Sequence, residues 1–521
     1  MPRISMFNKL TKSIFTILLV ASAIAPFASA QGRKAMAEKP YADTRFGYQV
    51  TSFDKWTTVP PEPSERYLVM KFVSPSDIID PKILVSHTPY FEILKFDPTG
   101  KSASLLDREE GNKEKDGPKT GDGPKSGEDS EPINMKDIQE KMAYKTFEQY
   151  LGKASGMQMM GKAETKKFGK LSAKVYNFKE VTSFKLFIRH YAVAFTNDKK
   201  EEIVLHYSIM ERAFEEWKEL FDRSVLSFKF IKVDEKKDSD LDAMTPLQRS
   251  EAVHKEDCAR TGWRFEKTEH YFIKFSIDND KFVKECKERI EAIRKVFVKE
   301  FGDRELTEYP VVRICKNFDE YGNYGGPGGS AGYFNSHSKE LVMPSLKDYD
   351  VKWTWAVMNH EAFHQFIWFR CGELAPHSWY NEGTGDYFAG FKYRGNNSFE
   401  IGTVGPSLLL IDRVTPVREA LKKGELAPLD KLIRFTQQDY YAKGDIYYPQ
   451  GWSFIYFLRE AKKMGHKPFK PEWGNILKVY FDTMVETKDA DKAVEVAFRD
   501  LKGDAMAELE KSYLLFIKDL K

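Results

Sequence analysis

Two histidines and a glutamate form the pattern H-E-x-x-H at His360, Glu361 and His364. They lie within Val351–Arg370, a run without Gly or Pro that we expect to be helical. On a helix the two histidines are one turn apart, so both imidazoles can bind one Zn²⁺ ion. Glu361 projects about 100° further round the helix and can act on a water molecule as general base. The pattern predicts a catalytic zinc site; the alternative is a chance pair of histidines on a buried helix.

A third metal ligand is expected shortly after this helix. A catalytic zinc takes three protein ligands and keeps a fourth position open. Glu382 and Asp386 are four residues apart, so on a second helix they also share one face. Glu382 could complete the zinc site, and Asp386 could accept the free ring N–H of a ligand histidine. Two helices that each carry a correctly spaced polar pair, joined by a short loop with Pro and Gly, strengthen the prediction.

These residues also carry a family resemblance. His360-Glu361-x-x-His364 followed by Glu382-x-x-x-Asp386 resembles the gluzincin metallopeptidases, the broad group of thermolysin and aminopeptidase N. The local motif Trp379-x-x-Glu382-Gly383 is closer to the bacterial peptidase MA-like families. The resemblance covers roughly residues 265–521. Seventeen residues separate His364 from Glu382, one fewer than in aminopeptidase N. That group's Gly-rich exopeptidase motif is not in its usual place, so we do not infer an aminopeptidase.

The resemblance implies a zinc-dependent metallopeptidase that hydrolyses peptide bonds. It assigns His360, His364 and Glu382 to the Zn²⁺ ion and makes Asp386 the residue that holds a ligand histidine in place. Glu361 would take the proton of the attacking water and deliver it to the leaving amine.

Related families have a Tyr-x-x-x-Trp motif that matches Tyr448 and Trp452. By resemblance, Tyr448 is the candidate donor to the oxyanion, with Tyr447 as its alternate and His377 as another possible donor. Ordinary aromatic packing and an ordinary polar contact are the alternatives for these residues.

A short hairpin is expected before the first helix, with strands at Gly332–Phe334 and Glu340–Met343. In gluzincins an edge strand beside the active helix pairs with the substrate backbone. The resemblance therefore makes Gly332, Tyr333 and Phe334 candidate substrate-binding residues, and a purely structural hairpin is the alternative.

Two other functions compete with the peptidase. The first is a serine hydrolase, because Gly328-Gly329-Ser330-Ala331-Gly332 matches G-x-S-x-G. A nucleophile elbow needs a strand directly before the serine and a helix directly after it, and here Gly and Pro precede Ser330 while a strand is expected to follow. The second is a catalytically silent binding protein of the cell envelope, in which the zinc site only braces the fold.

The first 30 residues are typical of a signal peptide. Three basic residues precede the apolar run Ile14–Ile24, and Ala28-Ser29-Ala30 fits a cleavage site, so the mature chain would be secreted or periplasmic. An uncleaved anchor is the alternative; no later stretch is long and apolar enough to cross a membrane. The formal net charge is +3 and the segment carries three basic residues and no acidic ones, so the mature chain is near 3 − 3 = 0. This balance argues against general nucleic-acid binding, and a peptide or protein substrate is the expected partner.

The remaining chain predicts an α+β protein with two folded parts. Strand patterns over Ala173–Phe178, Phe184–Phe195 and Glu202–Tyr207, followed by a helix, resemble a PsbP-like α/β domain with an antiparallel sheet over residues 31–231. Residues 107–132 are almost entirely charged residues, Gly, Pro and Ser, which predicts a disordered insertion. We expect a linker over 232–256 and the zinc metallopeptidase domain over 257–521, with a small sheet, the active-site helix and a mainly helical C-terminal part.

Four cysteines remain: Cys258, Cys286, Cys315 and Cys371. None forms a C-x-x-C pair, so a cysteine-based zinc site is not expected. Export would permit disulfides, and four cysteines allow three pairings. Either one or two disulfides brace the catalytic domain, or the four are free buried thiols.

Overall fold

The computed structural model describes residues 35–59, 61, 65–100, 103, 143–153, 156–182, 185–233, 244–336, 338–345, 351–402, 404 and 412–520. The expected signal peptide and the expected insertion at 107–132 lie outside these residues. The chain folds into two compact units. The first contains Lys71–Lys101 and Met135–Val233 with the residues up to Thr57, and the second contains Asp234–Lys521 with Thr58–Met70 and Ser102–Asn134. Among the described helices, none has the length and apolar character needed to cross a bilayer.

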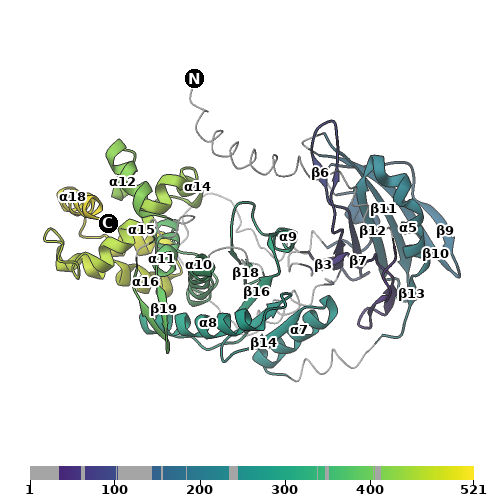
Figure 1. The fold of residues 1–521 in the computed structure, drawn as a ribbon, viewed down its shortest axis with the longest axis horizontal. Helices are drawn as coiled ribbons and strands as arrows, with labels where there is room; N and C mark the ends of the chain where they lie inside the picture. The colour runs from purple at the N-terminus through teal and green to yellow at the C-terminus, as the bar shows by residue number, and fades with distance from the viewer. Residues whose placement is uncertain are drawn as a thin grey trace, which may run out of the picture. The chain divides into compact units, whose positions relative to one another are not determined.

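The first unit contains an antiparallel sheet (Figure 1). Strands β7, β12, β11 and β10 pair in this order, and β8 and β9 both pair with β10. The antiparallel sheet predicted for this part of the chain is therefore confirmed. The bounds of these strands, and of β3 and β4 on the β7 side, are β3 Thr57–Val59, β4 Leu68–Val73, β7 Tyr90–Phe96, β8 Met157–Met159, β9 Glu164–Phe168, β10 Leu171–Val181, β11 Phe187–Thr196 and β12 Glu202–Met210.

Strand β12 is buried along its whole length because both faces of the sheet are covered. On one face, Tyr207 stacks on Phe221 of helix α5 at 4.7 Å between ring centroids. On the other face, Phe147 of helix α4 contacts Tyr176 and His206. The smaller elements of this unit are β1 Tyr41–Asp43, β2 Tyr48–Val50, β5 Ile78–Ile79, β6 Ser86–His87, β13 Lys229–Phe230, α4 Phe147–Leu151, η1 Glu211–Ala213 and α5 Phe214–Leu226.

The second unit begins with a five-stranded mixed sheet in the order β14-β15-β16-β18-β17. The three central strands are parallel, and the two edge strands β14 and β17 are antiparallel to their neighbours. The hairpin expected from the sequence is confirmed: Tyr333 of β17 pairs with Val342 of β18. The strands of this unit are β14 Arg264–Lys267, β15 Phe272–Phe275, β16 Val311–Cys315, β17 Tyr333–Asn335, β18 Glu340–Pro344, β19 Lys392–Gly395 and β20 Ser398–Glu400.

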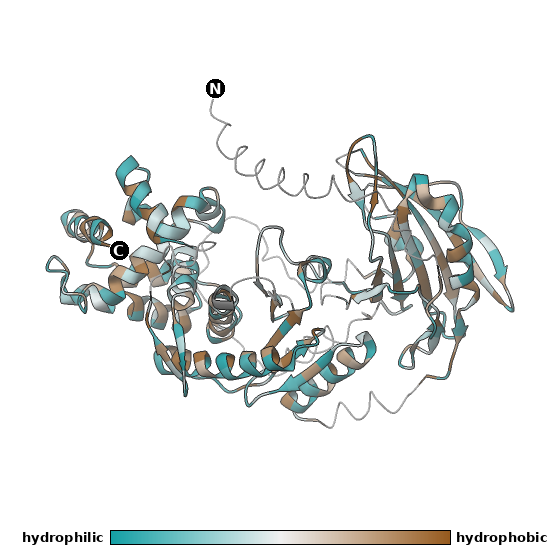
Figure 2. Ribbon diagram, viewed as in Figure 1, coloured by the Kyte–Doolittle hydropathy of each residue, from teal (hydrophilic) through white to brown (hydrophobic). Residues whose placement is uncertain are grey.

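Helices make up most of the rest of this unit, as the sequence predicted. Apolar side chains of the sheet, of α8 and α10, and of the C-terminal helices form one continuous core. Figure 2 colours the ribbon of these elements by the hydropathy of each residue. The helices are α7 Pro246–Thr261, α8 Asp280–Phe301, α9 Phe318–Asn323, α10 Val351–Arg370, α11 Ser378–Ala389, α12 Val414–Lys423, α13 Leu429–Leu432, α14 Gln437–Tyr441, α15 Gly444–Glu460, η3 Pro471–Asn475, α16 Ile476–Thr487, α17 Ala490–Ala497 and α18 Asp504–Asp519.

The prediction of a linker over 232–256 is wrong for residues 246–256, which belong to helix α7. Thr245 caps this helix: its side chain accepts from the backbone N–H of Gln248, whose own side chain accepts from the N–H of Thr245. Such a capping box satisfies two backbone donors at a helix start. The polar composition of the segment concealed these helix signals.

All four cysteines are free and buried, so the second of the two alternatives holds and no disulfide forms. They lie in α7, in α8, at the end of β16 and just beyond α10, and each is at most 1% exposed. Burial raises the pKa of the Cys258 thiol to about 11 and that of Cys286 to about 12. These thiols are structural core residues rather than reactive groups.

Candidate metal centre

Helices α10 and α11 bring the predicted residues together. Gly385 lets the two helices approach closely, because a Cβ atom at this position would lie 3.0 Å from the imidazole Cε1 and Nδ1 atoms of His360. Helix α11 is almost completely buried, and Pro376 precedes its first turn. The face of α11 that carries Glu382 and Asp386 is therefore fixed against the face of α10 that carries the histidines.

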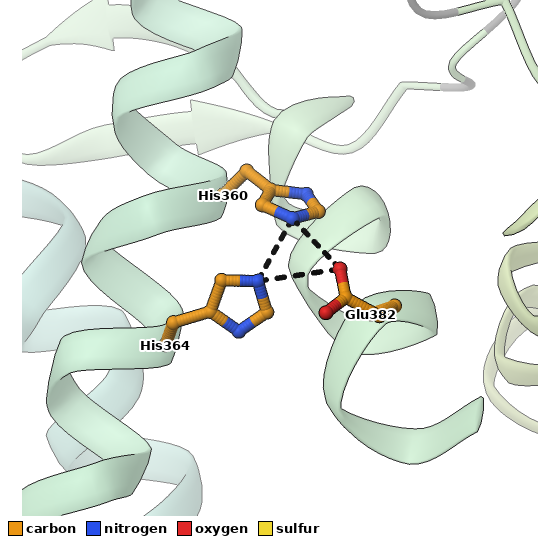
Figure 3. A group of neighbouring side chains, drawn as sticks. All are labelled: His360, His364 and Glu382. Carbon is orange, nitrogen blue, oxygen red and sulfur yellow. Dashed lines mark hydrogen bonds and ion pairs between the residues drawn. The ribbon is translucent and has the colours of Figure 1, made fainter. Parts of the chain in front are cut away.

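Three side-chain atoms converge between these helices (Figure 3). The Nε2 atoms of His360 and His364 are 2.9 Å apart. Oε2 of Glu382 lies 3.3 Å from the first and 3.5 Å from the second. Ligand atoms at the corners of a zinc tetrahedron are about 3.3 Å apart when each metal–ligand bond is about 2.0–2.1 Å. The spacing and the N, N, O donor set fit a zinc ion, and both histidines and Glu382 form the only such group among the described residues.

The other ring nitrogen of each histidine faces an oxygen acceptor. Nδ1 of His360 lies 3.1 Å from Oδ1 of Asp386, and Nδ1 of His364 lies 3.1 Å from Oδ1 of Asn381. An acceptor at Nδ1 holds the proton on that nitrogen and leaves a lone pair on Nε2. Two lone pairs and a carboxylate oxygen then point at one another with no donor between them. This arrangement requires a cation, or added protons, at the point where they meet.

The two acidic residues are also held at their second oxygen. Tyr441 at the end of α14 donates to Oε1 of Glu382 at 2.8 Å. Nε of Arg413, just before α12, donates to Oδ2 of Asp386 at 2.6 Å. Glu382 is therefore directed to the cluster through one oxygen only, and Asp386 connects the guanidinium of Arg413 to His360.

The electrostatics of the cluster follow from burial and mutual attraction. Burial alone would lower the pKa of His360, but hydrogen bonds to Asp386 and Glu382 raise it well above its ordinary value. Burial would raise the pKa of Glu382, but the two imidazoles hold it well below its usual range. Asp386 likewise has a lowered pKa despite its burial, because Arg413 and His360 stabilise the carboxylate. Both acidic groups are thus kept as anions.

Glu361 lies beside the cluster in a cleft of about 830 Å³. Burial raises the pKa of its carboxyl group, an effect that the imidazoles of His360 and His364 oppose only in part. The carboxylate accepts a hydrogen bond from the backbone N–H of Phe334 in strand β17. Gly332 allows this approach, because a Cβ atom there would lie 3.3 Å from Cγ of Glu361.

The cleft also receives the three residues predicted to bind substrate. Gly332, Tyr333 and Phe334 line it, together with Trp353 and Trp368 of α10. Strand β17 is the last strand of its sheet, so one of its edges is not paired within the sheet. The structure thus places an edge strand, a carboxylate and the candidate metal-binding cluster in one cleft.

Of the three residues predicted as oxyanion donors, Tyr448 lines the cleft, whereas Tyr447 and His377 do not. Tyr448 lines the cleft, stacks on Tyr441 at 5.8 Å between ring centroids and hydrogen-bonds to it. Tyr447 packs against Phe435 and does not line the cleft. His377 is held by Asp491 and the hydroxyl of Tyr480, at 3.1 Å each, and also lies outside the cleft lining.

Ser330 lies at the rim of the same cleft but lacks the setting of a nucleophile elbow. A loop precedes it and strand β17 follows it, where an elbow needs a strand and then a helix. Its Oγ atom lies 2.6 Å from the hydroxyl oxygen of Tyr321, and its O–H group donates to the carbonyl of Pro327. The described contacts of Ser330 include no histidine.

Sequence reasoning did not identify Asn381, Arg413 and Tyr441. Asn381 is adjacent to Glu382, and its place one turn from the helix start could have suggested a partner for the second histidine. Arg413 and Tyr441 reach the site from segments 27 and 59 residues beyond their partners. Only the tertiary fold brings them there.

Comparisons with known proteins identify no family for this chain. No family model matches it, and no curated protein matches it. Among solved structures, cyanobacterial PsbP (CyanoP) from Synechocystis is 15% identical, covering 40% of this chain and 99% of its own at a TM-score of 0.22. LpqN, involved in cell envelope biogenesis of Mycobacterium tuberculosis, is 11% identical over 38% of this chain and 91% of its own, with a TM-score of 0.21. A protein from Bacteroides thetaiotaomicron is 6% identical over 62% of this chain and 77% of its own, also at 0.21.

Proposed function

We propose that this protein is an exported zinc-dependent metallopeptidase. The observation that carries the proposal is the convergence of three electron-pair donors, Nε2 of His360, Nε2 of His364 and Oε2 of Glu382, in an open cleft. The Nδ1 contacts with Asp386 and Asn381 orient both imidazoles for metal binding. Three protein ligands with cleft space beside them are the arrangement of a catalytic rather than a structural zinc site.

The chemistry divides between the metal and the chain. Bound zinc lowers the pKa of a water molecule and polarises a carbonyl group. Glu361 supplies the base: its carboxylate, next to the cluster, accepts the proton of the attacking water and returns it to the nitrogen of the leaving amine. Asp386 and Asn381 hold the imidazole tautomers throughout, and Tyr448 can donate to the oxyanion of the tetrahedral intermediate.

The substrate is expected to bind as an extended peptide. Strand β17 is the last strand of its sheet among the described residues, and its residues Tyr333 and Phe334 line the cleft beside Glu361. Pairing with this edge would supply backbone hydrogen bonds whatever the sequence of the peptide. Trp353 and Trp368 add apolar surface for substrate side chains.

Metal content is the first test. Elemental analysis of the mature protein, residues 31–521, should find about one zinc ion per chain. The double variant His360→Ala, His364→Ala should lose it. Absence of bound metal from the parent, even after zinc is supplied, would overturn the proposal.

Cleavage of a mixed peptide library is the second test. Glu361→Gln should keep zinc and lose nearly all turnover, because the amide cannot accept a proton. Glu486→Gln, an exposed change on α16, is the matched control and should cleave like the parent. A Glu361→Gln variant as fast as the parent would refute the role of this residue. Bound zinc without cleavage of any peptide would favour the silent binding protein. Export is tested separately by sequencing the N-terminus of the secreted or periplasmic protein, which is expected to begin at Gln31.

A further inference from the structure

One face of helix α10 borders the cleft along most of the length of the helix. The residues of this face lie within about 100° of one another around the helix axis. Those that line the cleft are Trp353, Val357, His360, Glu361, His364 and Trp368. The two tryptophans stand at the ends of this row, about 22 Å apart along the axis at 1.5 Å per residue. An extended peptide rises about 3.3 Å per residue, so the row is as long as roughly six or seven residues of substrate.

Strand β17 runs along the same row. A Cβ atom at Gly332, just before the strand, would lie 2.6 Å from Cγ1 of Val357. Further along, the ring centroid of Phe334 lies 6.1 Å from that of Trp368. Successive strand residues point to opposite faces, yet Tyr333 and Phe334 both line the cleft. The edge of β17 therefore borders the cleft, and a peptide paired with this edge would extend along α10 past the metal centre.

The charged side chains of the cleft lie near its middle and are already engaged. Among the described residues that line it, the ionisable ones with a carboxylate or a guanidinium are Glu361, Glu382, Asp386 and Arg413. Glu382 belongs to the metal-binding cluster, and Glu361 is the proposed base. Asp386 contacts His360 and also balances the charge of Arg413 at 2.6 Å. Because burying an unpaired charge is costly, the charged end of a peptide needs a spare partner, and these residues do not supply one.

The two ends of the row are apolar instead. Trp353 is one helical turn from Val357, and Trp368 packs near Phe334. Both tryptophans are partly exposed, so each ring offers a rigid apolar surface to a bound side chain. Burial of a large apolar side chain against such a surface strengthens binding about tenfold relative to a charged one.

We propose, on the basis of the peptidase function proposed above, that this protein is an endopeptidase for unfolded polypeptide. It cleaves within extended segments that carry large apolar side chains on both sides of the scissile bond, and Trp353 and Trp368 each select one side. Each cut adds one water across the C–N bond and leaves a new carboxylate and a new amine. In a folded protein such side chains are mostly buried, so six or seven extended residues enter the cleft only from an unfolded chain.

Ten-residue peptides with acetylated N-termini and amidated C-termini test the proposal. The parent should cut internally a peptide of Ala, Ser and Gly that carries Phe near both ends, and about tenfold more slowly a peptide with Lys at those two positions. It should also cut reduced and alkylated lysozyme but not native lysozyme. Removal of single residues from free ends, with the blocked peptides left intact, would overturn the proposal.

Trp353→Ala and Trp368→Ala assign the two ends. Each variant should lose about tenfold in kcat/KM on a peptide with Phe at one end, and nothing on a peptide with Ala at that end. The two variants should affect opposite ends. Any general loss of folded protein cancels, because each variant is compared with itself on two peptides. Phe265→Ala, on edge strand β14 of the same sheet, is the control and should keep the preference of the parent. A preference that survives in both tryptophan variants would overturn the proposal.

Peptide binding separates this proposal from the peptidase function on which it rests. Fluorescence anisotropy of labelled blocked peptides should show that Glu361→Gln binds the peptide with two Phe about tenfold more tightly than the peptide with two Lys. Binding with this preference, but no cleavage of either peptide by the parent, would overturn the peptidase function and with it the endopeptidase. Cleavage by the parent with equal binding of both peptides would overturn the present proposal alone.

Discussion

Replacing Asp386 by Asn should weaken zinc binding although Asp386 is not itself a ligand. In the parent, both carboxylate oxygens are acceptors, for Nδ1–H of His360 and for Nε–H of Arg413. An amide has one oxygen and one N–H₂ group, so one of these two donors must face another donor. If the oxygen stays with Arg413, the amide N–H₂ faces Nδ1 of His360 and favours the tautomer with its proton on Nε2, where the metal would bind.

The magnitude follows from the contact that is lost. Leaving a buried donor unpaired costs about 1–3 kcal/mol, and the loss of such a histidine partner weakens metal binding by roughly 10- to 100-fold. Zinc affinity is measured by competition with a chromophoric chelator. Asp491→Asn is the matched control, because Asp491 contacts the imidazole of His377 at 3.1 Å but lies outside the cleft lining and is 86% exposed.

The control should bind zinc like the parent. An Asp386→Asn variant with zinc affinity within about twofold of the parent would refute the argument that the Nδ1 contact sets the tautomer of His360. A loss of equal size in the Asp491→Asn control would point to a general effect on the fold instead. Melting temperatures of both variants, measured without zinc, distinguish a local from a global loss.

Tyr441→Phe removes the donor to Oε1 of Glu382. Competition with a chelator should then show about tenfold weaker zinc binding. An unchanged zinc affinity would show that this hydrogen bond does not orient Glu382. Ser330→Ala should leave the peptidase rate unchanged, whereas loss of turnover would favour the serine-hydrolase alternative. Burial would raise the pKa of Glu92, but the hydrogen bond with His206 and the charge of Lys71 lower it to about 2 from 4.5. Because the folded pKa is the lower one, this carboxylate stabilises the fold fully above pH 4.5 and progressively less as the pH falls towards 2. Denaturant titrations of the parent should show that this group accounts for about 2 kcal/mol of the loss in unfolding free energy between pH 5 and pH 3. The Glu92→Gln variant should lack this part of the loss. Parallel pH profiles for parent and variant would contradict the assignment.

Local spacing predicted the core of the candidate site well. His360 and His364, one turn apart, and Glu382 and Asp386, one turn apart, each lie on one helix, and helical geometry alone places each pair on one face. Whether the two faces meet depends on the packing of α10 on α11, which Gly385 permits. In the sequence Gly385 is only a glycine within a helix. No spacing rule predicts that it lies against the imidazole of His360.

Other parts of the structure could not be predicted because long-range contacts decide them. Arg313 and Lys274 are almost fully buried in central strands, where their charges meet Glu340 at 2.7 and 3.1 Å. An alternating pattern would place such residues on a solvent face. The pKa of Glu340 is held well below its usual range, since Arg313 and Lys274 outweigh the effect of burial. Only the tertiary fold reveals that Glu340 and Asp257 together neutralise these two charges inside the protein.

The four free thiols give this protein built-in probes of its own local unfolding. Cys258, Cys286, Cys315 and Cys371 are at most 1% exposed, so a thiol reagent can reach each one only when its surroundings open. Their positions sample the start of the second unit, its long helix α8, its central strand β16 and the end of the helix that carries the histidines. Variants that keep a single cysteine would convert labelling rates into four separate opening free energies. Comparing those energies with and without zinc would measure how far the influence of the metal extends through the fold.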